Sequence, residues 1–75
     1  MTKVLVLRCG DEAIHIAGKP ELMDYLVHWI TMHDYQTQRY PENEMDIFEF
    51  ENYNYFEACN DKATKLGLLQ VTKKS

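Results

Sequence analysis

The segment VLVLRCGDEAIHIA, residues 4–17, decides the fold. Its first part, Val4–Leu7, is continuously apolar and half β-branched, which is typical of a central strand buried on both faces. A Gly-Asp-Glu turn signal follows at residues 10–12, and residues 13–17 then alternate in the way a half-buried strand does. The segment therefore predicts a β-hairpin whose strands are residues 2–9 and 13–17.

Two helices are predicted further along the chain. The first begins at residues 18–21, where a proline suits the first turn and a glutamate complements the helix dipole, and it runs to about Tyr35. The second begins at Asn54, because the spacing to Glu57 resembles a capping box, and it ends at Gly67 in a left-handed conformation.

The remaining segments predict two more strands and one loop. Met45–Glu51 alternates and predicts a third strand, Leu68–Thr72 predicts a fourth, and the polar, proline-containing stretch 36–44 predicts a loop. The order ββαβαβ is typical of an α+β two-layer sandwich, with a four-stranded mixed sheet and both helices on one face. The third and fourth strands should be parallel, since a helix joins them. We expect one domain over residues 1–72 and a frayed basic tail at 73–75.

Two helices can cover only one face of such a sheet. Strand alternation places under the helices Val4, Val6, Ile14, Ile16, Phe48, Phe50, Leu69 and Val71. The open face then carries Leu5, Leu7 and Ile47, and contiguous exposed apolar side chains usually mark a contact surface. These three residues are the predicted face of a homodimer. The alternative is that the 36–44 loop or the tail shields Leu5 and Leu7.

Charge is strongly segregated along the chain, although the formal net charge is only -4. Residues 21–61 contain ten acidic residues and one arginine, which leaves -9, whereas residues 62–75 contain four lysines and no acid. An acidic field attracts a basic protein surface and accelerates the encounter. The predicted partner-binding residues are Glu42, Glu44, Asp46, Glu49, Glu51, Tyr53, Glu57 and Asp61. The alternative is an ordinary solvated acidic surface.

A second candidate patch lies on one flank of the first helix. It contains Tyr25, Trp29 and Met32, and aromatic residues and methionine are enriched at the cores of interfaces. The alternative is that Trp29 only edges the hydrophobic core.

Catalytic, metal and cofactor chemistry finds little support in the sequence. The three glycines are isolated, so there is no phosphate-binding loop, and the cysteines and histidines match no metal-binding spacing. The one catalytic pairing that the hairpin suggests is Cys9 with His15 on a shared sheet face, and no orienting residue is identifiable beside it. We expect a protein that is not an enzyme and binds no cofactor or metal.

The composition also predicts the setting in which the protein acts. No apolar run suits a signal peptide or a membrane span, and two cysteines cannot form a disulfide framework, so we expect a cytoplasmic protein with free Cys9 and Cys59. The acidic balance opposes direct binding to nucleic acid. The hypothesis is a small regulator or inhibitor that masks a basic surface, such as that of a nucleic-acid-binding protein, in the manner of DNA mimics and phage-encoded inhibitors. The alternative is a self-associating subunit that homodimerises through the open sheet face.

Overall fold

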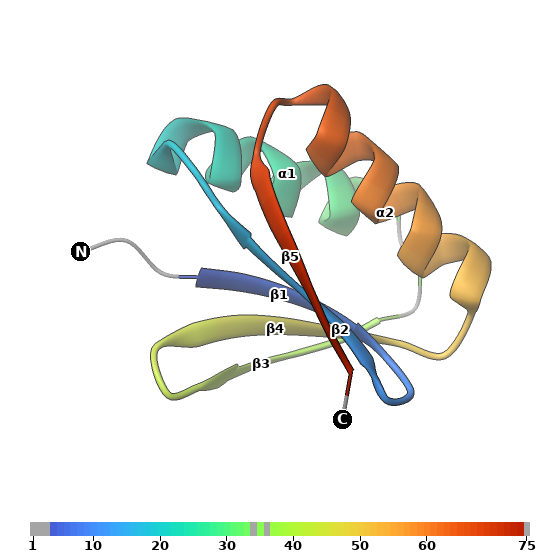
Figure 1. Cartoon of the computed structure of the whole chain (residues 1–75). Helices are drawn as coiled ribbons and strands as arrows, with labels where there is room; N and C mark the ends of the chain where they lie inside the picture. The colour runs from blue at the N-terminus through green and yellow to red at the C-terminus, as the bar shows by residue number, and fades with distance from the viewer. Residues whose placement is uncertain (1–3, 34, 36, 75) are drawn as a thin grey trace.

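A computed structural model describes residues 4–33, 35 and 37–74 of the chain, with Lys74 described by its backbone alone. Two helices pack on one face of a five-stranded mixed sheet (Figure 1). The elements in chain order are β1 (Val4–Cys9), β2 (Glu12–Ala17), α1 (Pro20–Met32), β3 (Gln38–Glu42), β4 (Met45–Phe50), α2 (Tyr53–Lys65) and β5 (Leu69–Lys74). The α+β class and the two helices are confirmed, whereas the predicted count of four strands is wrong.

The strands lie in the order β3-β4-β1-β2-β5. β1 is antiparallel to β2 and parallel to β4, while β5 pairs antiparallel with β2 and β3 antiparallel with β4. These pairings make β4 and β5 run in the same direction, as expected for two strands joined by a helix. Two strands separate them in the sheet, so α2 crosses over the sheet to connect them (Figure 1).

The strand that the sequence analysis missed is β3, which falls in the predicted loop. It is an edge strand, and an edge strand tolerates Pro41 because alternate N–H groups face away from the sheet. Asn43 and Glu44 join it to β4 as a two-residue turn, with φ values of 49° and 64°. Positive φ at both positions is the mirror-image turn that matches the twist of paired strands.

The hydrophobic core lies between the helices and the covered face of the sheet. The buried residues that form it are Leu5, Leu7, Ile14, Ile16, Met23, Leu26, Ile30, Phe48, Phe50, Phe56, Cys59, Ala63 and Leu68. The predicted inward-facing residues of β2 and β4 are therefore confirmed. Those two strands alternate clearly in sequence, so their faces could be assigned in advance.

The predicted faces of β1 and β5 are wrong by one residue. Leu5 and Leu7 are 1% and 0% exposed and pack beneath the helices, so they cannot form the predicted dimer face with Ile47. Leu69 and Val71, predicted to lie beneath the helices, are 67% and 47% exposed. A shift of one residue exchanges the two faces of a strand.

The helix boundaries differ slightly from the predictions. α1 ends at Met32, three residues before the predicted Tyr35. The N-cap of α2 is Asn52, whose side-chain oxygen accepts a hydrogen bond from the backbone N–H of Asn54 at 2.9 Å. Gly67, just past the end of α2, has a φ of 78°, which confirms its predicted left-handed conformation.

The predicted basic tail is mostly strand. Lys73 and Lys74 pair with the start of β2, where Lys73 lies opposite Ala13 and Lys74 opposite Glu12. Residue 75 of that tail, and residues 2 and 3 of the predicted first strand, lie outside the described residues.

Candidate partner-binding surface

The predicted acidic surface is divided between the two ends of β4. Glu42, Glu44 and Asp46 lie at the β3–β4 hairpin, where β4 begins. The other members of the set lie at the far end of β4 or in α2, namely Glu49, Glu51, Tyr53, Glu57 and Asp61. A strand of six residues is roughly 17–20 Å long, which exceeds the Debye length of about 8 Å at physiological salt. The two groups therefore act as separate surfaces.

At the β3–β4 hairpin, an ion pair with Arg39 neutralises the charge of Asp46. Arg39 donates from Nε and Nη2 to the two carboxylate oxygens of Asp46, at 3.0 and 2.7 Å. This two-pronged geometry is the strong form of a charged hydrogen bond, and it raises the pKa of Arg39. The guanidinium also lies 5.2 Å from the centre of the Phe48 ring. Within the β3–β4 hairpin itself, Glu42 and Glu44 remain as exposed carboxylates.

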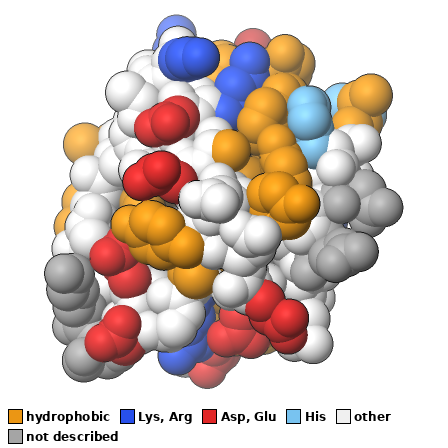
Figure 2. All heavy atoms as spheres, turned by 90° about the vertical axis from the view of Figure 1, so that its right-hand side faces the viewer, with side chains coloured by type: hydrophobic (Ala, Val, Ile, Leu, Met, Phe, Trp, Pro, Cys, Tyr) orange, Lys and Arg blue, Asp and Glu red, His pale blue; other side chains and the backbone are white. Residues whose placement is uncertain are grey.

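The far end of β4 gathers carboxylates from three elements. Because β1 and β4 are parallel, both strands end at the same edge of the sheet, where β2 and α2 also begin. This strand-end patch consists of Glu12 from β2, Glu49 from β4, Glu51 after it, and Tyr53 and Glu57 from α2. Figure 2 shows this side of the molecule, with carboxylates spaced along it and hydrophobic side chains between them.

The strand-end patch borders a shallow hollow of about 620 Å³. Its lining includes Cys9 and Gly10 at the end of β1 together with Glu49 and Glu51. Glu12 was not among the predicted binding residues, because it reads as part of a turn. The signal that identifies it is the hairpin itself, which pairs Cys9 with Glu12 and so brings that carboxylate to the end of β1.

Tyr53 reports the negative potential of the patch. Its pKa is raised chiefly by the carboxylate of Glu12, then by partial desolvation, and then by Glu57 and Cys9. Its side chain is 52% exposed, and its ring packs on Phe56 with a centroid separation of 5.5 Å. The core therefore holds the base of this aromatic ring while its other side stays available among the acids, an arrangement that suits contact with a partner.

Asp61 extends the patch along α2. It follows Glu57 by four residues, so the two exposed carboxylates lie on one side of the helix. Lys62 and Lys65 then occupy the last turn, where positive charge complements the helix dipole. The acidic surface thus ends at Asp61, just before the last turn of α2.

The second candidate patch is partly exposed. Tyr25 and Met32 are 48% and 69% exposed, whereas Trp29 is partly buried and packs against the core. The Nζ of Lys62 lies 5.4 Å from the ring centre of Tyr25 and 5.6 Å from that of Trp29. The indole also contacts His33, with a centroid separation of 4.1 Å. Neighbouring rings and a lysine therefore occupy much of this flank.

The pairing of Cys9 with His15 does not form. Cys9 follows Leu5 and Leu7 on the covered side of β1, whereas His15 lies opposite Val6 and faces the open side. Both cysteines are free, and burial raises the pKa of the Cys59 thiol to about 12. Within residues 4–33, 35 and 37–74, no three His, Cys, Asp or Glu side chains are grouped so that they could hold a metal ion.

In the part of the chain that the structure describes, no helix combines the length and apolar character needed to cross a membrane. Comparisons with protein-family models, with curated proteins and with solved structures found no match to this chain.

Proposed function

We propose that this chain is a small, non-enzymatic interaction protein that binds and masks a basic surface of another macromolecule, acting as a regulator or inhibitor. The observation that carries the proposal is the strand-end patch, in which the charges of Glu12 and Glu57 act on the exposed ring of Tyr53, while Glu49 and Glu51 lie at the same end of the sheet. A negative field at that point is indicated by the raised pKa of Tyr53.

The chemistry of the patch favours a partner rich in arginine and lysine. Carboxylates attract such a surface over several ångströms and then form charged hydrogen bonds with it, while a tyrosine adds apolar contact area. A nucleic-acid-binding protein is the partner class that we favour, because its surface is built to neutralise rows of anionic groups. In that form the carboxylates would stand in for phosphates, as in a DNA mimic.

The test compares charge reversals at the two ends of β4. The strand-end variant combines Glu51→Lys with Glu57→Lys, and the hairpin control combines Glu42→Lys with Glu44→Lys. All four carboxylates are exposed, and both variants change the net charge by the same amount. The immobilised wild type and both variants are used to capture proteins from a lysate at about 50 and 500 mM salt, spanning Debye lengths from roughly 14 to 4 Å.

We expect the wild type and the hairpin control to retain the same basic proteins at low salt and to release them at high salt. The strand-end variant should bind them at least roughly tenfold more weakly, because each reversal replaces an attraction with a repulsion. Capture that resists high salt, or that survives the strand-end reversals, would contradict the proposal. Equal losses in both variants would show that overall charge, rather than this patch, is responsible.

A further inference from the structure

The open face of the sheet presents side chains in rows that cross the strands. Residues directly opposite one another on neighbouring strands share a face, so the pairing registers of the strands define each row. The central row runs through Val71, His15, Val6, Ile47 and Tyr40, one residue from each of the five strands. Four of these five side chains are aliphatic or aromatic, and no helix covers them (Figure 1).

The two flanking rows differ sharply in polarity. The row towards the start of β1 contains Leu69, Ala17, Val4, Met45 and Glu42. The row towards the end of β1 contains Lys73, Ala13, Arg8, Glu49 and Gln38. The open face is therefore apolar over two adjacent rows and charged over the third.

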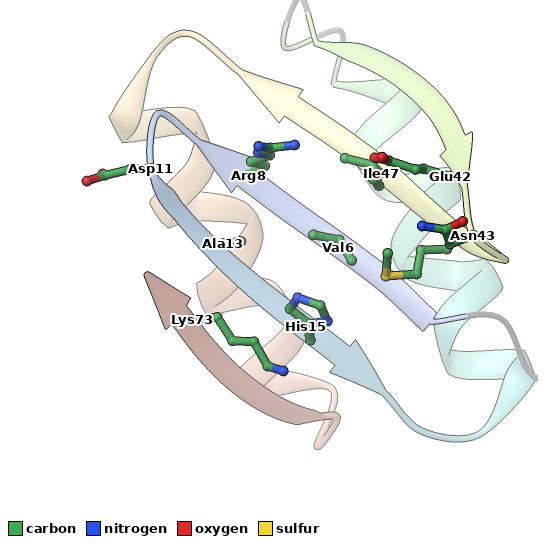
Figure 3. Close-up of a pocket in the computed structure, with 10 residues that line it drawn as sticks. Val6, Arg8, Asp11, Ala13, His15, Glu42, Asn43, Ile47 and Lys73 are labelled. Carbon is green, nitrogen blue, oxygen red and sulfur yellow. The ribbon is translucent and has the colours of Figure 1, made fainter. Parts of the chain in front are cut away.

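The exposed apolar surface is concentrated at the β5 edge of this face. Leu69 and Val71 are 67% and 47% exposed, whereas Val6 and Ile47 at the centre are each only 3% exposed. A hollow of about 250 Å³ lies over the centre of the face, and Val6, Ile47, His15 and Arg8 line it (Figure 3). One edge thus projects apolar side chains, and the middle is recessed.

We propose that this open face is a homodimer interface, in which two copies pack face to face about a twofold axis running along β1. This operation lays β5 of one copy over β3 of the second, and β2 over β4, while each row meets the same row. The central apolar rows then meet each other, with Val71 over Tyr40 of the second copy. In the row of Leu69, that side chain lies over Glu42 of the second copy and beside its Met45, at one corner of the interface. The proposed interface shares only Glu49 with the strand-end patch and does not rest on the proposed function.

The charged row distinguishes the two possible orientations. In the proposed one, Lys73 of one copy lies over Gln38 of the second and within reach of its Glu49, and the twofold axis repeats that contact. The two Arg8 side chains meet on the axis, each beside Glu49 of its own chain. The opposite orientation, with the axis across the strands, would press the charged row onto the apolar row beginning at Leu69, and burying unpaired charge against apolar side chains is costly. Packed sheets with aligned strands cross at about 30° because of their twist.

The size of the face places the proposed dimer among weak complexes. Five strands spaced about 4.8 Å apart and six residues long cover roughly 24 by 20 Å, which corresponds to about 1,000 Å² buried by both copies together. That area is at the lower limit for a specific interface. We therefore expect a dissociation constant on the order of 10 μM, with monomer and dimer both present at ordinary laboratory concentrations.

The test is sedimentation of the full chain from about 1 μM to 1 mM, a range that brackets the expected dissociation constant. Wild type should pass from monomer to dimer across this range. Val71→Lys, on the open face, should remain monomeric, whereas Thr72→Lys, the adjacent exposed residue on the covered side of the same strand, should dimerise like wild type. A wild type that stays monomeric at 1 mM, or equal loss in both variants, would overturn the proposal.

A second pair of variants distinguishes the face-to-face dimer from pairing of two free β5 edges. Lys73→Glu should weaken dimerisation about tenfold, and adding Glu49→Lys should restore it, because the two sites meet only between copies. Within one chain they are three strands apart, about 14 Å, where screening leaves little interaction. Edge pairing would leave Glu49→Lys without any restoring effect, and that result would overturn the face-to-face arrangement.

Discussion

The two faces of the sheet are built from the same strands but differ in what they bury. On the covered face, Leu7, Ile16 and Phe48 are 0–2% exposed beneath two helices. On the open face, Val6 and Ile47 are each 3% exposed although they lie outside the core cluster, and Leu69 and Val71 project into solvent. The comparison indicates that burial on the covered face stabilises the fold, whereas the open face is the surface through which we propose that folded copies associate.

The largest expected effect contrasts two adjacent residues of β1. Leu7→Ala should lower the free energy of unfolding by about 3 kcal/mol, because it leaves a cavity inside a fully packed core. Val6→Ala should cost about 1 kcal/mol, since it removes fewer atoms and the surface above it can adjust. Urea unfolding at about 1 μM, below the expected dissociation constant, measures both values for the monomer. Equal losses of unfolding free energy in the two variants would contradict the conclusion that the covered face contributes more to the stability of the monomer than the open face.

In β1, adjacent apolar residues point to opposite faces of the sheet, and this explains why the predicted faces of its side chains are exchanged. Val4–Leu7 is apolar at every position, so either alternate set could point inward, whereas Ile14 and Ile16 are separated by a histidine and identify their own face. β5 has the same ambiguity, because Leu68 and Leu69 are adjacent and only Leu68 enters the core. β3 is polar and contains Pro41, and its strand conformation depends on pairing with β4.

The candidate site was also only partly predictable from the sequence. Glu51 and Glu57 lie where the predicted end of a strand meets the predicted start of a helix, and they do share one end of the molecule. The separation of Glu42 and Glu44 from them follows from the length of an extended strand, about 3.3 Å per residue. Glu12 reaches the patch only through the register of the hairpin, which the turn sequence alone does not determine.

The second expected effect concerns protein concentration. If copies associate through the open face, the free energy of unfolding of wild type should rise with concentration, by up to about 0.7 kcal/mol per chain for each tenfold increase above the dissociation constant, and the urea midpoint should rise with it. Val71→Lys should remove this dependence and Thr72→Lys should keep it. A wild-type midpoint that stays constant between about 1 and 100 μM would show that the folded state gains nothing from association in that range.

The third effect is a loss of stability at alkaline pH, caused by Cys59 in the core beneath the helices. Burial raises the pKa of the Cys59 thiol from 9.0 to about 12, so the thiol stays protonated in the folded chain while the unfolded chain ionises above pH 9. This contribution to stability is intact below pH 9 and is lost as the pH rises towards 12. At pH 10 we expect the free energy of unfolding to be about 1 kcal/mol lower than at pH 8 because of this group alone.

The matched control for the pH effect is Cys59→Ala. Tyrosines and lysines also titrate in this range, and their contribution remains in the variant, so the difference between the two pH profiles isolates the thiol. Profiles that run parallel from pH 8 to 10.5 would contradict a buried, protonated Cys59.

The smallest expected effect is the stability of the two lysine variants as monomers. Val71→Lys and Thr72→Lys each replace an exposed side chain on the edge strand β5, and the strand already ends in Lys73 and Lys74. At about 1 μM both should unfold within roughly 0.5 kcal/mol of wild type, as surface substitutions usually do. Any larger gap that opens between them at high concentration then reports association through the open face rather than damage to the fold. If Val71→Lys were already less stable by 2 kcal/mol in dilute solution, Val71 would belong to the folding core of the monomer, and the two faces would not divide as described.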